Sequence, residues 1–559
     1  MATAQANAAA PLDQLLVDAG AGPLRRWLPG RPGVEFIASL AGKPGKVGRR
    51  VSTVLGERDR VALGRSAAEP KRGDQRFADL AWTHNPWLRR LVQADPATCD
   101  AVAGLVDDAG LAWLSDQKIR FLAENLVGAI SLSNVPFVNP ASAKAVVDTG
   151  GASVVRGTRA FVRDMSCSQR VPRMADPDAL KPGPDLALTL GAVVFRSSVL
   201  ELIQYTPQSE RVRSVPLLIV PPTINKFYGT DLAPGRSLIE YLGRAGQQVF
   251  VISWRNPRAD GAAWGMDTYG EGIADTLGAI GKICEIDRTL LLAACSGGII
   301  TSMLLGHLAA RAGQDRIAGP GLLVTVLDQA KAGLPAAFVG KATLDRAAAS
   351  SARKGYLDGA TLAGLFAWLR PGDLIWNYGV NNYLLGREPP VFDILSGNAD
   401  PTRMSAALHR DFLTVCGGNQ LITPGAATML GMPVELSAVG VGNYVVAGAA
   451  DHLCPWQNCY QSTQLLGGDS RFVLSTSGHI AAIVNPPGNP KASYRVGEEK
   501  LADAGQVDAG VLHRTGSWRE DYAGWLTERG GPLKPSPAKL GTTGLAPLAD
   551  ASGAYVVES

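Results

Sequence analysis

Residues 288–312 read Arg-Thr-Leu-Leu-Leu-Ala-Ala-Cys-Ser-Gly-Gly-Ile-Ile-Thr-Ser-Met-Leu-Leu-Gly-His-Leu-Ala-Ala-Arg-Ala, and they decide the fold. An apolar run ends at Cys295, a Ser-Gly-Gly step follows, and a second apolar run of helical length comes next. The pattern predicts a buried strand, a tight turn that carries the cysteine, and a helix. Such a turn brings neighbouring backbone close and needs small flanking residues, which Ala293 and Gly297 supply.

A strand, turn and helix of this kind is how α/β-hydrolases display their nucleophile. The predicted fold class is therefore α/β, with an α/β-hydrolase fold and a mostly parallel central sheet. A serine is usual at this turn, and a cysteine there indicates acyl chemistry through a thioester. A buried cysteine is more often inert packing, but the small residues on both sides of Cys295 favour a nucleophile.

The chain has 559 residues, more than the roughly 250–300 at which a single core stops growing, so at least two structural units are expected. Residues 1–75 are predicted to form a flexible basic arm that is poorly ordered or loosely helical, and that is either a solvated surface or a binding segment for an anionic partner. Helical patterns broken by prolines predict a helical N-terminal domain at 76–185. Strand and helix patterns then alternate, which predicts a catalytic domain at 186–559.

Several apolar runs in the last region have the length and composition of strands. They are residues 215–220, 248–254, 290–294, 322–328, 444–447 and 471–475. The gap between the fourth and fifth runs is far longer than a strand connection needs, so a cap (lid) subdomain is predicted at about 330–435. Its aromatic segment at 366–378 is either core or the lining of an acyl pocket that excludes water.

Chain order supplies the partners of Cys295. In this fold an acid follows a late strand, and a histidine follows the last one. Asp451 comes shortly after the run 444–447, and His479 comes shortly after 471–475. Both positions are at carboxyl ends of predicted strands, where open α/β sheets place their sites. The predicted catalytic residues are therefore Cys295, Asp451 and His479.

Each residue has a chemical role. A free thiol is only a few per cent ionised at neutral pH, so His479 is predicted as the base that generates the thiolate. Asp451 would fix the tautomer of the imidazole and stabilise its charged form. The developing oxyanion needs two backbone N–H donors. We expect them from Ser296, which follows the nucleophile, and from Ile224, in the loop after the strand 215–220.

The other histidines and cysteines receive structural interpretations. His452 adjoins Asp451 and is either a second base or, as we favour, a structural hydrogen-bonding residue. His307 is predicted to be a satisfied core residue, and Cys454 and Cys459 are predicted to serve in packing. Three histidines have no supporting neighbours: His84, His409 and His513.

Composition argues against several classes of protein. The formal net charge of +4 is small for this length and gives no electrostatic case for nucleic acid. The seven cysteines form no CxxC pair, so reduced thiols are expected, without a disulfide framework or metal site. Polar side chains within 288–312 argue against a transmembrane segment. The first residues lack the pattern of a secretory signal, so a cytoplasmic protein is expected.

Nine segments carry a resemblance to one enzyme family. In chain order they are LELIQY at 200–205, VPPTINKFY at 220–228, VISWRNP at 251–257, ACSGG at 294–298, DLIWNY at 373–378, NNYLLG at 381–386, AGAADH at 447–452, SGH at 477–479 and NPPGNPK at 485–491. The chain resembles the polyhydroxyalkanoate synthases, closest to the class II (medium-chain-length) type, over roughly residues 85–555. Ala293 departs from a usual glycine, and Ser396-Gly397 depart from a usual aromatic pair, which leaves chain-length preference open.

The resemblance implies an acyltransferase that polymerises (R)-3-hydroxyacyl-CoA into polyhydroxyalkanoate. Cys295 would take the acyl group from coenzyme A, and the 3-hydroxyl of another unit would then attack the thioester. Asp451 would either only orient His479 or also help to activate that hydroxyl. The resemblance further implies no cofactor, because coenzyme A is the substrate's leaving group. It implies a homodimer on the surface of cytoplasmic polymer granules, in contact with the growing polyester and with granule-associated proteins.

Two other functions fit the same residues. A thioesterase or depolymerase-type hydrolase would use the same triad with water as the acceptor. A non-catalytic granule scaffold would keep the fold alone, although the complete triad argues against it.

Overall fold

The computed structural model describes most of the chain. The described residues are 30–70, 74–167, 169–176, 179–329, 341–369, 371–394, 400–451, 453–497 and 512–558. The predictions made for residues 1–29, for His452 and for Ser396-Gly397 lie outside the described residues.

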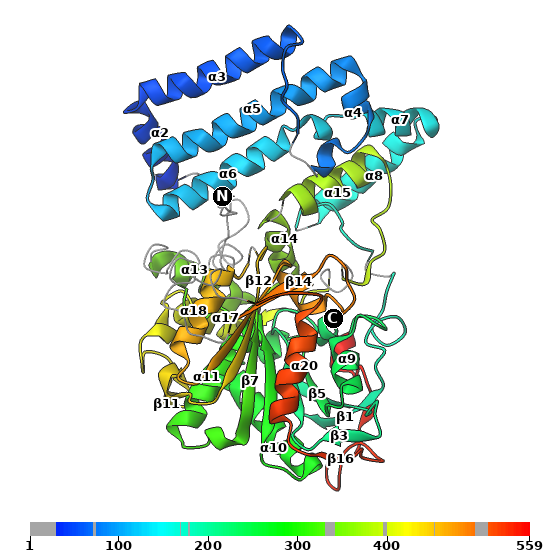
Figure 1. Cartoon of the computed structure of the whole chain (residues 1–559), viewed down its shortest axis with the longest axis vertical. Helices are drawn as coiled ribbons and strands as arrows, with labels where there is room; N and C mark the ends of the chain where they lie inside the picture. The colour runs from blue at the N-terminus through cyan, green and yellow to red at the C-terminus, as the bar shows by residue number, and fades with distance from the viewer. Residues whose placement is uncertain are drawn as a thin grey trace. The chain divides into compact units, whose positions relative to one another are not determined.

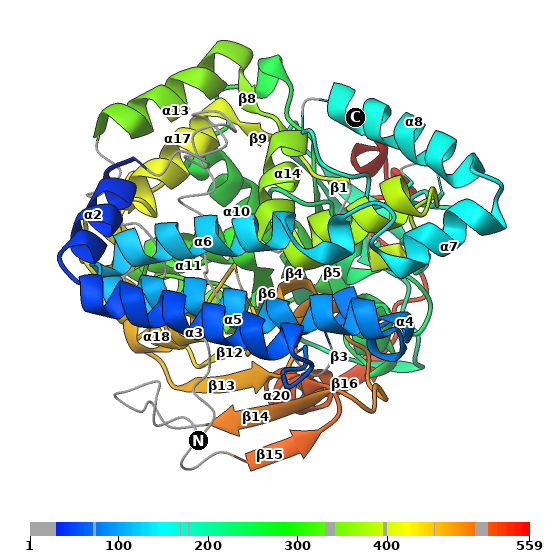
Figure 2. The ribbon, with the colours of Figure 1, turned by 90° about the horizontal axis from the view of Figure 1, so that it is seen from above.

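Contacts between residues divide the chain into two compact units. The helical unit lies within Gly22–Asp176 and Gly364–Pro390, and the sheet unit lies within Pro177–Ala363 and Val391–Ser559. The main helices of the helical unit are α2 (Gly30–Ala41), α3 (Pro44–Ala62), α5 (Pro86–Ala109), α6 (Trp113–Ala129), α7 (Pro140–Asp148) and α8 (Ala152–Ser166). Figures 1 and 2 show α3, α5 and α6 side by side.

The helices α2 and α3 lie in the part of the chain for which the sequence predicts a flexible arm. Polar contacts hold them to the end of α5. Ser39 and the Lys43 ammonium donate hydrogen bonds to the Ala109 carbonyl, and Arg50 pairs with Asp108 at 2.8 Å. The last turn of a helix presents unpaired carbonyls and a partial negative charge, which favour such cations. These partners are about sixty residues away in sequence, so composition alone suggested a solvated basic segment.

Part of the predicted cap also belongs to the helical unit. Residues 364–390 are grouped with the N-terminal helices rather than with the sheet. Tyr383 donates a hydrogen bond from its hydroxyl to Asp164 at 3.0 Å, and Asn382 donates to the Arg173 carbonyl at 2.7 Å. Gly157 of α8 lies against the Tyr383 carbonyl, with no room for a side chain. The observed units therefore differ from the division predicted from the sequence, which placed boundaries at residues 75 and 185 and a cap at 330–435.

The sheet unit contains an eleven-stranded sheet in the order β15-β14-β13-β12-β7-β6-β4-β5-β2-β1-β17. Its strands are β1 (Gly191–Arg196), β2 (Leu200–Tyr205), β4 (Leu217–Val220), β5 (Val249–Trp254), β6 (Thr289–Ala294), β7 (Ile317–Leu323), β12 (Asn443–Gly448), β13 (Ser470–Ser475), β14 (Ser493–Gly497), β15 (Leu512–Thr515) and β17 (Ala549–Asp550). The six strands from β13 to β5 run parallel, and the outer strands pair antiparallel. The predicted mostly parallel sheet is confirmed.

Helices cover both faces of this sheet, so its central strands are buried. They include α9 (Leu238–Arg244), α10 (Met266–Cys284), α11 (Cys295–Ala310), α18 (Trp456–Leu465), α19 (His479–Val484) and α20 (Trp518–Arg529). In Figure 1, α11 and α18 lie to the left of the sheet, and α9 and α20 lie to its right. Of the helices in the described part of the chain, none has the length and apolar character needed to cross a membrane.

The strand predicted at 322–328 is wrong in its position, because β7 begins at Ile317 and ends at Leu323. Val324 has a φ of 42°, in the left-handed region that ends the strand. Inside β7, Gly319 and Gly321 leave space for the aromatic side chains of α20. Glycine is depleted in strands, so these two residues lower the strand propensity of β7, and the strand is not predicted at its true position.

We predict that Gly319→Val destabilises the sheet unit, although valine favours strands. A Cβ at this position would lie 2.6 Å from the Trp525 ring, and overpacking of this kind costs about 1–3 kcal/mol. Gly497→Val in β14 is the matched control, because no atom lies within 4 Å of its Cβ position. Thermal denaturation followed by circular dichroism should show a lower midpoint for Gly319→Val only. Equal midpoints for the two variants would contradict the packing argument.

Candidate active site

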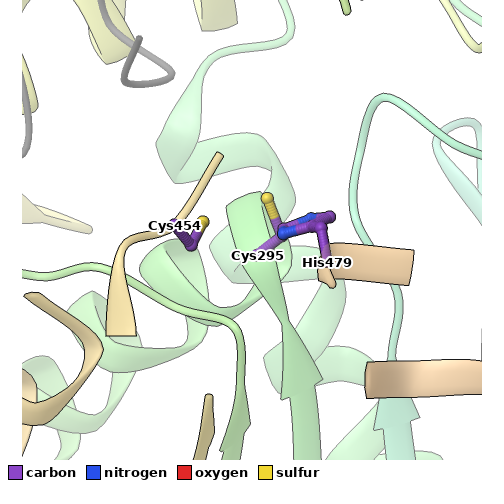
Figure 3. Close-up of side chains that lie close together, drawn as sticks. All are labelled: Cys295, Cys454 and His479. Atoms are coloured by element: carbon purple, nitrogen blue, oxygen red, sulfur yellow. The ribbon is translucent and has the colours of Figure 1, made fainter. Parts of the chain in front are cut away.

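Cys295 lies at the turn between β6 and α11, as the sequence predicts (Figure 3). Its φ of 48° is in the left-handed region, which is strained for a residue with a side chain. Two close contacts surround this turn. A Cβ at Gly297 would collide with the Pro221 carbonyl, and a Cβ at Gly298 would collide with the Thr325 hydroxyl. The two glycines therefore let α11 begin directly beside the ends of β4 and β7.

Ser296 joins this turn to the loop that follows β4. Its hydroxyl accepts a hydrogen bond from the Thr223 amide at 3.0 Å and lies 3.1 Å from the Thr223 hydroxyl. The Ser296 backbone N–H is directed at the Cys295 sulfur. Ile224 is buried in the same loop, and its carbonyl accepts a hydrogen bond from the Thr402 amide at 2.9 Å. The roles of Ser296 and Ile224 as oxyanion donors stay predictions.

Asp451 and His479 meet at the carboxyl ends of β12 and β13. The Nδ1 atom of His479 lies 2.7 Å from Oδ2 of Asp451. Oδ1 of Asp451 accepts hydrogen bonds from the backbone N–H groups of Leu453 and Cys454 at 2.8 and 2.9 Å. The aspartate side chain is fully buried, so both of its oxygens are held in place.

His479 also hydrogen-bonds to the Cys295 sulfur. The structure thus brings together the three residues predicted from chain order, in the sequence Cys295, His479, Asp451. The elements that carry them are the N-terminus of α11, the start of α19 and the loop after β12.

A fourth residue at this site was missed by the sequence analysis. The sulfur of Cys454, a residue interpreted there as packing, lies within 4.8 Å of the Cys295 sulfur, and its thiol is the largest influence that lowers the pKa of Cys295. In Figure 3, Cys454 and His479 flank Cys295 from different segments of the chain. The available signal was its position three residues after Asp451, in the loop that turns back toward the site. Cys459, by contrast, directs its thiol to the Cys454 carbonyl at 3.7 Å.

These contacts favour a charged thiolate and a charged imidazole. The Cys454 hydrogen bond is the main cause that lowers the pKa of Cys295, and His479 and the Ser296 amide act in the same direction against burial. Burial by itself lowers the pKa of His479, but Asp451 and Cys295 outweigh it, so the pKa is raised. The hydrogen bond to Cys295 and burial raise the pKa of Cys454, which keeps this thiol protonated.

Two cavities border the catalytic residues. One of about 70 Å³ is lined by His479, Ala294 and apolar side chains that include Phe227, Ile480 and Ile483. A second, of about 10 Å³, is lined by residues that include Cys295 and Cys454. The first is lined mostly by apolar side chains, with Asn225, Lys226, Thr230 and His479 as its polar ones. The second has about the volume of one water-sized probe.

Among the described residues, one group of side chains has the composition of a metal site. The donor atoms of Cys295, Cys454 and His479 lie within 4.8 Å of one another. The prediction that the protein uses no metal stays a prediction.

Two of the remaining histidines have structural partners. His307 of α11 is buried, with Nδ1 3.0 Å from the Met429 carbonyl oxygen. His409 is buried with Nδ1 2.7 Å from the Ser351 hydroxyl. The interpretation of His307 as a satisfied core residue agrees with its contact, whereas the partner of His409 was not foreseen.

The fold and the site together define a class: an α/β-hydrolase-fold protein with a cysteine, a histidine and an aspartate in hydrogen-bonding order. Residues 73–242 match the family described as Poly-beta-hydroxybutyrate polymerase (PhaC) N-terminus. Residues 216–486 match the family described as alpha/beta hydrolase fold. The predicted fold class is therefore confirmed.

Similar proteins identify the family. The chain is 41% identical over 498 residues to poly(3-hydroxyalkanoate) polymerase 1 of Ectopseudomonas oleovorans, which covers 89% of each chain. It is 41% identical to polymerase 2 of the same organism, over 90% of each chain. The polymerase subunit PhaC of Cupriavidus necator is 34% identical, over 94% of this chain and 91% of the relative. The chain belongs to the poly(3-hydroxyalkanoate) polymerase family and is an acyltransferase, as the resemblance implied.

Solved structures resemble only part of the chain. A hydrolase from Pseudomonas aeruginosa has 19% identity and a TM-score of 0.33, and covers 54% of this chain and 94% of its own. A monoacylglycerol lipase from Paleococcus ferrophilus has 14% identity and a TM-score of 0.34, and covers 59% of this chain and 99% of its own.

The Cys454 contact predicts a change in pH dependence. The pKa of Cys295 is lowered to about 5, so the thiolate is present above this value and is protonated as the pH falls through it. Cys454→Ala removes the hydrogen-bond donor and should raise the pKa of Cys295 by about one to two units, since a bond to a charged group contributes about 1.5–3 kcal/mol. The rate of iodoacetamide alkylation at Cys295, followed by peptide mass spectrometry, measures this change. Cys454→Ser keeps a donor and should retain the low midpoint, whereas an unchanged midpoint in Cys454→Ala would refute the assignment.

Proposed function

We propose that the protein polymerises (R)-3-hydroxyacyl-CoA into polyhydroxyalkanoate through a thioester on Cys295. The observation that carries the proposal is the hydrogen-bonded series Cys295, His479, Asp451 at the carboxyl ends of the sheet. It occurs in a chain of the polymerase family, whose named members are poly(3-hydroxyalkanoate) polymerases. Together they support acyl transfer rather than a structural role.

In the first half-reaction, the Cys295 thiolate attacks the thioester carbonyl of the substrate. The oxyanion that forms would be stabilised by backbone N–H groups, for which Ser296 and Ile224 are the candidates. Ser296 is suited to this role because its N–H is directed at the sulfur and its side chain is fixed by Thr223. Collapse of the intermediate breaks the bond to coenzyme A, and the charged His479 protonates the departing thiolate.

In the second half-reaction, a 3-hydroxyl attacks the acyl thioester on Cys295. His479, now neutral, removes the hydroxyl proton, and the Cys295 thiolate leaves as the new ester bond forms. Asp451 has both oxygens occupied, one by His479 and the other by two backbone amides. We therefore assign Asp451 to orienting His479 and not to activating the hydroxyl directly.

The cavity of about 70 Å³ beside His479 gives this chemistry a suitable environment. Its lining is mostly apolar, which suits the hydrocarbon part of a hydroxyacyl unit and excludes water that would compete with the hydroxyl. The mechanism needs no metal or cofactor, because coenzyme A only leaves. We further propose that the protein acts as a homodimer at the surface of cytoplasmic polymer granules, in contact with granule-associated proteins.

The direct test supplies the purified protein with (R)-3-hydroxybutyryl-CoA and (R)-3-hydroxydecanoyl-CoA in separate reactions. Free coenzyme A is measured with a thiol reagent, and the acyl product is identified by mass spectrometry and nuclear magnetic resonance. We expect polyester to accompany coenzyme A release, and the two rates to reveal the chain-length preference. Release that yields only free hydroxy acid would assign the protein to the hydrolases instead.

Substitution of the histidines tests the choice of base. His479→Gln should lower the rate of coenzyme A release by about 10²–10⁴-fold, the contribution of a positioned general base. His452→Gln should lower it by less than about tenfold, because a residue outside the triad does not move the proton. Cys295→Ala provides the baseline without a nucleophile. The reverse ranking of the two histidine variants would overturn the assignment.

A further inference from the structure

A second thiol stands directly against the nucleophile. The Cys454 thiol hydrogen-bonds to the Cys295 sulfur, and the two sulfur atoms lie within 4.8 Å of each other. The two residues are far apart in sequence and come from different loops, one at the turn after β6 and one after β12 (Figure 3). Both cysteines are free and buried.

The two sulfurs differ in reactivity, which sets the direction of any oxidation. Cys295 is held as a thiolate by three hydrogen-bonding contacts, whereas Cys454 stays a neutral thiol. Oxidation by hydroperoxides follows thiolate character. Cys295 is therefore the sulfur that reacts first, and Cys454 is the thiol placed to act second.

Space for a small oxidant exists beside both sulfurs. The cavity of about 10 Å³ borders Cys295, Ile299 and Cys454, and a cavity of that size holds roughly one water-sized molecule. Hydrogen peroxide is only slightly larger than water, whereas an acyl thioester does not fit there. The space beside the two sulfurs therefore suits the oxidant and not the proposed substrate.

We propose that Cys295 and Cys454 form a reversible disulfide when the protein meets a hydroperoxide. The Cys295 thiolate attacks one peroxide oxygen, the O–O bond breaks, and Cys295 becomes a sulfenic acid while hydroxide leaves and takes up a proton as water. The Cys454 sulfur then attacks the sulfenic sulfur and loses its proton. The S–O bond breaks, a second water leaves, and the S–S bond forms.

This bond would change the fate of the nucleophile. A disulfide occupies the Cys295 sulfur, so acyl transfer stops, but the sulfur is kept from sulfinic and sulfonic acids, which are not restored by thiols. Reduction by a dithiol returns both cysteines to the thiol state. Cys454 thus acts as a resolving cysteine that makes oxidation of the active site reversible.

The first measurement treats the purified full-length protein with hydrogen peroxide in the presence of a chelator. Peptide mapping without reducing agent should find the peptides of Cys295 and Cys454 cross-linked, with the loss of two hydrogen atoms in mass. Dithiothreitol should remove the cross-link. This result needs no enzyme assay, so it stands or falls separately from the proposed polymerase function. Absence of the cross-link in oxidised protein, or a cross-link from Cys295 to another cysteine, would overturn the proposal.

Matched variants test the protective role. In oxidised Cys454→Ser, Cys295 should accumulate as sulfinic and sulfonic acids. Each protein is compared by the fraction of its own starting activity that dithiothreitol restores. This fraction should be at least about fivefold smaller in Cys454→Ser than in the unmodified protein. Cys459→Ser is the control, because this buried thiol of the same segment faces the Cys454 carbonyl; it should respond as the unmodified protein does. Equal recovery in Cys454→Ser and Cys459→Ser would refute the resolving role. If Cys454→Ser does not fold, the cross-link in the unmodified protein decides the question.

Discussion

The backbone of Cys295 is the constraint on which the active site depends. A left-handed φ at a residue with a side chain costs of order 1–3 kcal/mol. Cys295 keeps this conformation because the packed elements on both sides of it fix the course of the backbone. β6 fixes the residue before it, and α11 begins at once after it. Gly297 and Gly298 lie so close to Pro221 and Thr325 that larger residues would push the helix away from the sheet. The strain therefore aims the sulfur outward from the sheet's carboxyl edge, where side chains from other strands can reach it.

The electrostatics of the site follow from that position. A buried thiolate is unfavourable unless hydrogen bonds and an opposite charge compensate its desolvation. Here the compensation comes from His479, from the Ser296 amide and from the Cys454 thiol. Asp451 in turn supports the charge on His479, and two backbone amides fix Asp451. The same contacts that prepare Cys295 for acyl transfer also make it the most oxidisable sulfur, so reactivity and vulnerability have one cause.

Much of this site is predictable because chain order and strand ends are local signals. The apolar runs before Cys295, Asp451 and His479 mark three parallel strands, and residues at their carboxyl ends meet at one edge. The position of β7 was not predictable in the same way, because its glycines are required by the aromatic side chains of α20 that pack against them. The attachment of helices α2 and α3 was missed for a similar reason, since their basic residues are held by the distant end of α5.

The sequence by itself determined the fold class, the family and the three residues at the centre of the site, because each depends on short motifs and on their order. Only the tertiary structure decided that residues 364–390 pack with the N-terminal helices and that the Cys454 sulfur lies within 4.8 Å of the Cys295 sulfur. These contacts join segments far apart in the chain, and their partners are set by how the elements pack. The position of Cys454 three residues after Asp451 indicates only that it lies near the site, and its place beside Cys295 is set when β6 and β12 are brought into one sheet.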